Sequence, residues 1–248
     1  MVTTPIFRYG KTLTTIDRRN ALSMQIEVDE PVVLESLSID FSTDVVLQTP
    51  PFPRWQRTAH STEQIRHRVD HLREELRPKL DPRALYRVLP LAESGIEETD
   101  PPSSILSGEY ALVGLVAIGH GAEHDGGDSL LEGFLADALE NVAMQLARER
   151  VITDIRDGAN ELGLNTTRVI APGAGGMEWP IENRRFVFDR LPIGRIGVEL
   201  TENDHTRPRK TFSFVMGLGE DVEQPERLLA CRDCRHLDSC PYVGSVIE

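Results

Sequence analysis

Residues 110–119 read Tyr-Ala-Leu-Val-Gly-Leu-Val-Ala-Ile-Gly. This run is apolar, short and closed by Gly119, which predicts a buried strand over residues 110–118. The segment that follows, residues 128–157, carries the strongest helical pattern of the chain, and we expect that helix to stop at Gly158. Its apolar residues at mostly helical spacing are Leu131, Phe134, Leu135, Ala138, Leu139, Val142, Leu146 and Ile152.

Upstream of this strand and helix, a second helix is predicted from residue 61 to Pro78, because its apolar residues form one stripe. That stripe consists of Ile65, Val69, Leu72 and Leu76. Residues 84–89 are a compact strand candidate, and residues 94–102 are predicted to be a solvated loop. Residues 1–60 combine short β-like runs, such as residues 32–40, with a Pro-interrupted segment, which indicates an extended arm or edge strands.

Downstream, we expect a short helix over residues 182–191 and strands over residues 195–200 and 211–216. Strands and helices therefore follow one another without a regular βαβ alternation. This order favours an α+β fold.

The charge balance limits the classes of partner. The chain has 248 residues, with 27 Lys and Arg against 40 Asp and Glu, so its formal net charge is −13. A field of this sign opposes binding to a phosphate backbone, and nucleic acid is not an expected partner. The apolar run at residues 110–119 is far shorter than the about 20 residues that cross a bilayer. Residues 1–15 lack a signal core, and we expect a soluble cytoplasmic protein with no membrane partner.

A Gly- and Pro-rich loop at residues 168–176, Arg-Val-Ile-Ala-Pro-Gly-Ala-Gly-Gly, is the first candidate site. Glycines at 173, 175 and 176 permit backbone geometry in which amides approach a ligand closely. Arg168 adds a fork of donors that suits a carboxylate. The alternative is an ordinary surface connection with an exposed arginine.

The order of features over residues 168–216 extends this interpretation. They are Arg168, Pro172, Gly173, Pro180, the helix to Leu191, the run Ile-Gly-Val-Glu-Leu-Thr-Glu at 196–202, Pro208 and Ser213. This order resembles the activation domain of cobalamin-dependent methionine synthase, which binds S-adenosylmethionine and presents it to the corrinoid cofactor. The resemblance continues more weakly upstream, through residues 16–18, 86–90, 113–119 and Ala136-Asp137.

The resemblance implies a mainly antiparallel twisted sheet flanked by helices over residues 1–225. It implies that Arg168 contacts the methionyl carboxylate, that the backbone of Ala171, Pro172 and Gly173 lines the ligand, and that Glu202 lies near it. The family has Tyr directly after Pro-Gly, where this chain has Ala174. The lost ring removes a stacking or cation–π surface worth about 0.5–2 kcal/mol.

The last residues, 226–248, form a cysteine-rich tail that contains every cysteine of the chain. Cys231, Cys234 and Cys240 are spaced C-x2-C-x5-C, and Pro follows the last of them. Such spacing suits metal ligation, and Cys-Pro endings recur at iron–sulfur ligands. His236, a small-molecule ligand or a residue of a partner could supply a fourth ligand. An iron–sulfur cluster and a Cys3His zinc site are therefore alternatives, with reduced surface cysteines as a third.

The remaining histidines are weaker candidates for metal ligands. His67 and His71 have helical i, i+4 spacing, but no Glu stands in the H-E-x-x-H position, so solvated helix positions are expected. His120 and His124 follow the buried strand and are a weaker metal candidate. The sequence has no nucleotide-binding fingerprint and no hydrolase nucleophile motif, and no complete catalytic site of its own is predicted.

Three hypotheses about function follow. The first is an S-adenosylmethionine-binding partner protein that serves the reductive remethylation of a corrinoid. The corrinoid would be held by a cobalamin-dependent methyltransferase, such as methionine synthase, and an electron donor would take part. The second is a non-catalytic binding or assembly subunit with a structural zinc tail, which Ala174 favours. The third is an iron–sulfur electron-transfer protein.

Overall fold

The computed structural model describes residues 28–52, 55, 62–122, 130–173 and 179–225. Its centre is a five-stranded sheet in the order β1-β2-β3-β7-β4, in which every neighbouring pair is antiparallel. The strands are β1 (Val32–Leu34), β2 (Arg83–Pro90), β3 (Tyr110–Ala117), β7 (Thr211–Gly219) and β4 (Asn165–Thr166). The predicted strands at 84–89, 110–118 and 211–216 are thereby confirmed.

The central strand β3 is apolar throughout because both faces of the sheet are covered. Leu112 and Val116 point into one core, whereas Val113 and Leu115 point into a second core on the opposite face. Successive side chains of a strand alternate between faces, so a strand covered on both sides needs apolar residues at every position. This explains the uninterrupted apolar run of the sequence.

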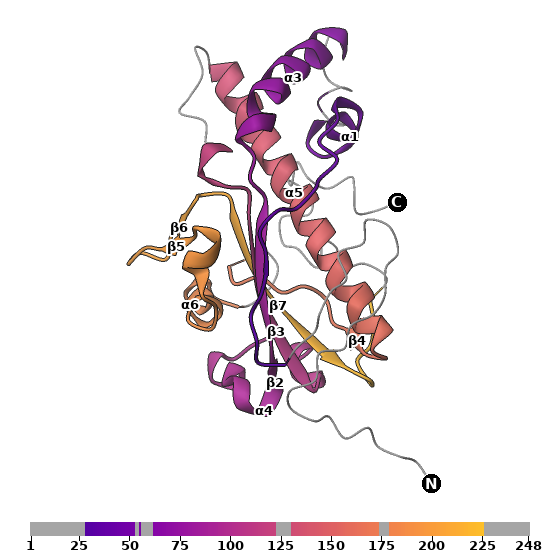
Figure 1. Ribbon diagram of the computed structural model, residues 1–248, viewed down its shortest axis with the longest axis vertical. Helices are drawn as coiled ribbons and strands as arrows, with labels where there is room; N and C mark the ends of the chain where they lie inside the picture. The colour runs from indigo at the N-terminus through magenta and orange to yellow at the C-terminus, as the bar shows by residue number, and fades with distance from the viewer. Residues whose placement is uncertain (1–27, 53–54, 56–61, 123–129, 174–178, 226–248) are drawn as a thin grey trace.

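Three helices cover the first face of the sheet: α5 (Leu130–Glu161), α3 (Thr62–Leu76) and α1 (Thr43–Gln48). Figure 1 shows α5 running along this side, with α3 and α1 packed at one of its ends. The expectation that α5 stops at Gly158 was wrong, because the helix continues to Glu161 and Gly158 is buried within it. A glycine in a helix costs about 1 kcal/mol relative to alanine, which packing against the core outweighs.

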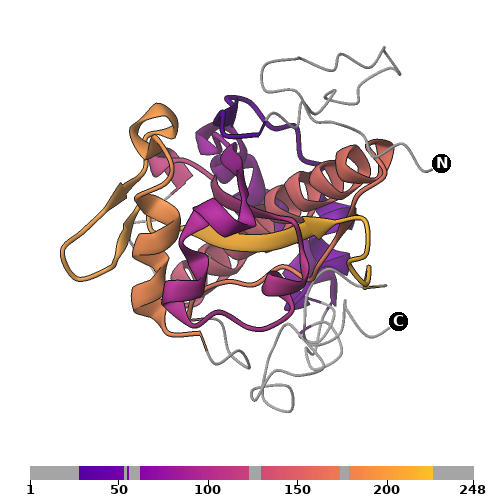
Figure 2. The same cartoon turned by 90° about the horizontal axis from the view of Figure 1, so that it is seen from below.

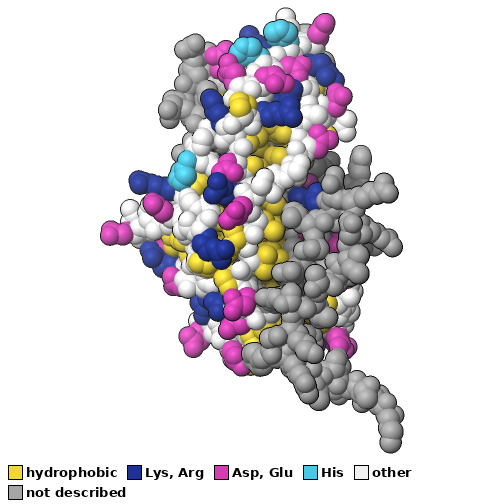
Figure 3. All heavy atoms as spheres, in the orientation of Figure 1, with side chains coloured by type: hydrophobic (Ala, Val, Ile, Leu, Met, Phe, Trp, Pro, Cys, Tyr) yellow, Lys and Arg dark blue, Asp and Glu magenta, His cyan; other side chains and the backbone are white. Residues whose placement is uncertain are grey.

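The helix α3 lies where its apolar stripe predicted. Val69 and Leu76 are buried, and Ile65 and Leu72 pack partly buried against the same core. His67 and His71 are exposed, and Nδ1 of His71 lies 3.7 Å from a carboxylate oxygen of Glu75. Figure 3 shows histidines at this end of the molecule among charged side chains. The solvated interpretation of His67 and His71 is confirmed.

Short elements cover the second face of the sheet. They are the helices α4 (Leu91–Ser94) and α6 (Arg184–Phe188) with the 3-10 turns η2 (Ile96–Thr99), η3 (Ile105–Ser107), η5 (Ile181–Asn183) and η6 (Ile193–Ile196). The hairpin of β5 (Glu199–Leu200) and β6 (Thr206–Arg207) projects from this side. Figure 2 shows α6 and the hairpin on one side of β7 and α5 on the other. Two further turns, η1 (Arg77–Lys79) and η4 (His120–Ala122), join the helical layer to the sheet.

Three expectations for this second layer need correction. Residues 195–200 are not one strand, because η6 ends in the left-handed residue Gly197 and only Glu199–Leu200 pair, with β6. Residues 94–102 are not simply a solvated loop, because Ser94 is buried and Ile96 belongs to the second core. The helix predicted over 182–191 is shorter, and comprises η5 and α6.

The described part of the chain is therefore an α+β fold with a mainly antiparallel sheet flanked by helices, as predicted. Among the described residues, no helix has the length and apolar character to cross a membrane. The cysteine-rich tail expected over 226–248 lies outside the described residues.

Candidate functional site

The segment that carries Arg168 runs along the edge of the sheet beside β7. The Thr167 amide donates to the Gly217 carbonyl at 2.9 Å, and the Gly217 amide donates to Oγ1 of Thr167 at 2.8 Å. Further along, Ile170 and Val215 exchange two backbone hydrogen bonds, at 2.9 and 2.7 Å. Arg168 lies between these two anchor points with its side chain exposed. The backbone on both sides of this exposed residue is therefore fixed to the sheet.

The predicted loop leaves the sheet immediately after Ile170. Pro172 is buried, whereas Gly173 is exposed and has a φ of 75°. The Gly173 amide donates to the Trp179 carbonyl at 2.9 Å. A Cβ at position 173 would lie 2.8 Å from Cβ of Ile181, so both the conformation and the space require glycine here. Residues 174–178, including Ala174, lie outside the described residues.

Trp179 fixes the segment that returns from the loop. Its side chain is 1% exposed, and its indole N–H donates to the Thr99 carbonyl at 3.1 Å. Nδ2 of Asn183 donates to the same carbonyl, also at 3.1 Å. Neither residue was predicted from the sequence to belong to the site. A tryptophan three residues after the Gly-rich loop and directly before Pro180 was the available signal, because a buried indole N–H needs a partner.

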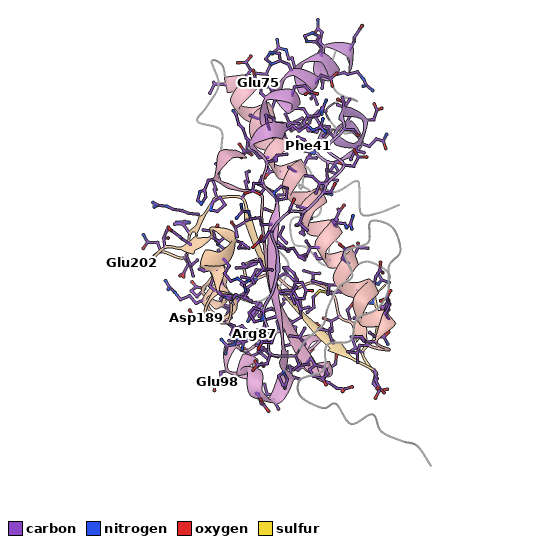
Figure 4. All side chains as sticks on the ribbon, viewed as in Figure 1. Phe41, Glu75, Arg87, Glu98, Asp189 and Glu202 are labelled. Atoms are coloured by element: carbon purple, nitrogen blue, oxygen red, sulfur yellow. The ribbon has the colours of Figure 1, made fainter. Side chains whose placement is uncertain are left out.

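Glu202 lies in the turn of the β5–β6 hairpin, and Figure 4 shows it at the outer end of that hairpin. Its side chain is exposed, and its carbonyl accepts a hydrogen bond from Nη2 of Arg185 at 2.8 Å. Arg185 also forms an ion pair with Asp204, with Nε and Oδ1 2.8 Å apart. The turn is thereby attached to α6.

Arg184 strengthens this attachment from a less exposed position. Its Nη1 donates to the Asp204 carbonyl at 3.1 Å. Burial lowers the pKa of the Arg184 guanidinium, and the nearby Asp204 charge opposes that shift. Since an arginine stays charged in proteins, α6 presents two cations to the hairpin turn.

The structure thus brings four of the predicted residues together in one segment: Arg168, Ala171, Pro172 and Gly173. Glu202 comes from a separate element. The link between the two is the stretch from Ile181, which packs beneath Gly173, to Arg185, which holds the Glu202 carbonyl. The site predicted from the sequence is therefore a continuous loop plus a hairpin turn, connected through η5 and α6.

A charged network that was not predicted from the sequence joins the exit of the hairpin to α5. Glu140 is completely buried, and its carboxylate lies 3.3 Å from Nη2 of Arg209 and 3.8 Å from Nζ of Lys210. Lys210 also contacts Asp137 at 2.8 Å and donates to Oδ1 of Asn141 at 2.6 Å. The signal was the pair of acidic residues Asp137 and Glu140 at i, i+3 spacing on one face of the helix.

The predicted metal ligands Cys231, Cys234, His236 and Cys240 lie outside the described residues, as does His124. Within the described ranges, no group of three or more His, Cys, Asp or Glu side chains is arranged to hold a metal ion. His120 is exposed, and its Nε2 lies 2.9 Å from the Gly197 carbonyl. This contact gives His120 a role in fixing the loop before β5.

Comparisons with known proteins find a likeness among solved structures. No protein-family model matches the chain, and no curated protein matches it. Among solved structures, it is similar to a crystal structure of the MetH reactivation domain bound to AdoHcy, with a TM-score of 0.49 and 11% identity. The match covers 79% of this chain and 80% of that chain. The resemblance expected for residues 168–216 is to a domain of this kind.

Proposed function

We propose that this chain binds S-adenosylmethionine and serves the reductive remethylation of a corrinoid that a cobalamin-dependent methyltransferase holds. Methionine synthase is the candidate partner. The observation that carries the proposal is the arrangement of Arg168 and Gly173. The arginine is exposed on a backbone fixed to β7, and the exposed left-handed glycine follows it in the same segment.

The residues of this segment suit the chemistry of the ligand. S-adenosylmethionine carries one carboxylate, one ammonium group, one sulfonium centre and an adenine ring. Arg168 would bind the carboxylate through paired N–H donors, and the backbone of Ala171, Pro172 and Gly173 would line the ligand. Bound at this site, the ligand supplies an electrophilic methyl group whose acceptor is the cobalt of the partner's corrinoid.

Glu202 would contribute charge rather than a fixed contact. Its side chain is exposed and its backbone carbonyl is held by Arg185, and a carboxylate near a sulfonium or ammonium cation is favourable. Because the Glu202 carboxylate faces solvent, water and salt screen its charge and keep this contribution small. We therefore assign Glu202 to the ligand's cationic part and Arg168 to its carboxylate.

The cysteine-rich tail would supply the second requirement of remethylation, which is an electron. In this proposal Cys231, Cys234 and Cys240, with His236 as the fourth ligand, hold an iron–sulfur cluster. The zinc alternative uses the same ligands but carries no electron, since zinc has no redox chemistry in proteins. Iron content and colour separate the two.

One sequence feature favours a second function. Ala174 stands where the methionine synthase family has Tyr, which removes an aromatic surface from the ligand site. A chain that kept the fold and lost the ligand would act as a binding or assembly subunit with a structural zinc tail. An iron–sulfur electron carrier without a corrinoid partner is the third candidate.

Calorimetric titration with S-adenosylmethionine tests the proposal, on protein purified without oxygen. The wild-type chain should bind, and Arg168→Ala should weaken binding by at least tenfold, the order expected for a charged hydrogen-bonded pair of about 1.5–3 kcal/mol. Arg66→Ala is the matched control, because Arg66 is paired with Asp44 on the helical face of the sheet. Absence of binding by the wild-type chain would leave the assembly function or the electron carrier, which iron content and reversible reduction distinguish.

A further inference from the structure

Two backbone carbonyls at the ends of the turn formed by residues 94–99 each accept two side-chain hydrogen bonds. The Ser94 carbonyl accepts from Nε and Nη2 of Arg190, at 2.9 and 2.6 Å. The Thr99 carbonyl accepts from Nε1 of Trp179 and Nδ2 of Asn183, both at 3.1 Å. All four donors belong to residues that follow the candidate ligand loop in the chain.

The 94–99 turn is itself a rigid support. Ile96 is completely buried in the second core, and Ser94 is 2% exposed. Oγ of Ser94 donates to the Leu91 carbonyl at 2.7 Å and accepts from the Ile96 amide at 3.2 Å. Arg190, which holds the Ser94 end, stacks 3.6 Å from the ring centre of Phe186. Figure 4 shows Arg87, Glu98 and Asp189 in this region of the second layer.

The contacts continue from this support to the candidate site. Trp179 uses its side chain to hold Thr99 and its carbonyl to accept the Gly173 amide, at 2.9 Å. Asn183 ends the turn η5, which begins at Ile181 beneath Gly173. Gly173 is therefore linked, directly through Trp179 and indirectly through η5, to two side chains that both attach to one carbonyl.

We propose that Trp179 and Asn183 are positioning residues of the S-adenosylmethionine site. Through the Thr99 carbonyl they hold the backbone of Ala171, Pro172 and Gly173 in its binding geometry before the ligand arrives. This inference rests on the proposed function, because it concerns the same site. A site that is ordered in advance binds more tightly, since less conformational entropy is lost on binding.

The decisive variant is Asn183→Asp, which keeps the size of the side chain but replaces the donor with an oxygen facing the Thr99 carbonyl. Binding of S-adenosylmethionine should weaken about tenfold, the order expected when a half-buried acceptor loses a donor. Gln145→Glu is the matched control. It makes the same amide-to-carboxylate change on α5, where Nε2 of Gln145 donates to Glu149 at 2.9 Å on the other face of the sheet. Both dissociation constants are measured by calorimetry below each variant's unfolding temperature.

A spectroscopic readout separates positioning from general loss of stability. The chain has two tryptophans, so a Trp55→Phe background leaves Trp179 as the sole indole emitter. In that background, titration with S-adenosylmethionine should shift the Trp179 emission, and the dissociation constant from this shift should equal the one from calorimetry. Asn183→Asp should also change the Trp179 emission of the ligand-free protein, because the indole is then held less firmly. If Asn183→Asp does not fold, Asn183→Ala replaces it, because alanine removes the donor without adding a repelling charge.

The outcomes separate the two proposals. Weak binding by Asn183→Asp together with unchanged binding by Gln145→Glu supports the positioning role. Equal affinity of Asn183→Asp and wild type, with unchanged Trp179 emission, overturns the positioning role while the proposed function stands. If the wild-type chain itself does not bind S-adenosylmethionine, the proposed function fails and the positioning role fails with it.

Discussion

The ring of Phe214 on β7 lies directly over Gly114 on β3. The two residues are register partners in the antiparallel pair, and Phe214 is completely buried. A Cβ at position 114 would overlap the end of the ring. Because Gly114 has no side chain, the middle of this apolar strand leaves room for the Phe214 ring of the neighbouring strand.

Gly114→Ala should lower the free energy of unfolding by about 1–3 kcal/mol, the usual cost of forcing an extra carbon into a packed core. Gly194→Ala is the control, because nothing lies within 4 Å of a Cβ added at Gly194. Urea denaturation followed by circular dichroism measures both changes. Equal stability of the two variants would show that the Phe214 ring moves aside without cost.

Lys210→Met should destabilise the protein far more than Arg209→Ala. The methionine removes a positive charge from beside the buried Glu140 carboxylate, which should lower the free energy of unfolding by about 3 kcal/mol. The Arg209 side chain is 63% exposed, and its loss should cost about 0–1 kcal/mol. Denaturant titration of both single variants and the double variant measures the coupling. A reversed order would mean that Arg209 is the main partner of Glu140.

Asp137 should make the protein sensitive to acid. Burial acts to raise the pKa of Asp137, but the hydrogen bond and charge of Lys210, with the charge of Arg209, outweigh it and hold the pKa below its usual value. A lowered folded-state pKa gives stability that is present above the unfolded value of 3.8 and is lost as the pH falls through the folded value. Asp137→Asn should flatten this part of the pH dependence, measured as the unfolding midpoint between neutral pH and strong acid. Parallel curves for variant and wild type would contradict the assignment.

Tyr86 should make the stability of the protein fall as the pH becomes alkaline. Burial, and after it the Asp154 charge, raise the pKa of the Tyr86 phenol well above its usual range. The resulting stability is fully present below the unfolded value of 10.0 and is lost as the pH rises above it. Tyr86→Phe should therefore lose less stability than wild type between pH 9 and 11, about the range in which an unfolded tyrosine ionises. An ultraviolet titration in which every tyrosine of the folded protein ionises near pH 10 would refute this prediction.

Local pattern was sufficient for much of the fold. The stripe of α3 and the uninterrupted apolar run of β3 depend on side-chain periodicity, which the sequence contains in full. The candidate loop was also visible, because Gly173 adopts the left-handed conformation that its position in a Gly-rich loop indicated. Propensity failed where packing outweighed it, as at Gly158, which continues α5 within the core.

The class of fold, the strands at the centre of the sheet and the place of Arg168 and Gly173 in one segment follow from residue types and their spacing. The shared use of the Thr99 carbonyl by Trp179 and Asn183, and the burial of Glu140 beside Lys210, arise only when the chain folds. The difference lies in distance along the chain. The Trp179 and Asn183 contacts join residues 80 and 84 positions apart, and a side chain's hydrogen-bond partner at that separation is set by the packing of whole layers.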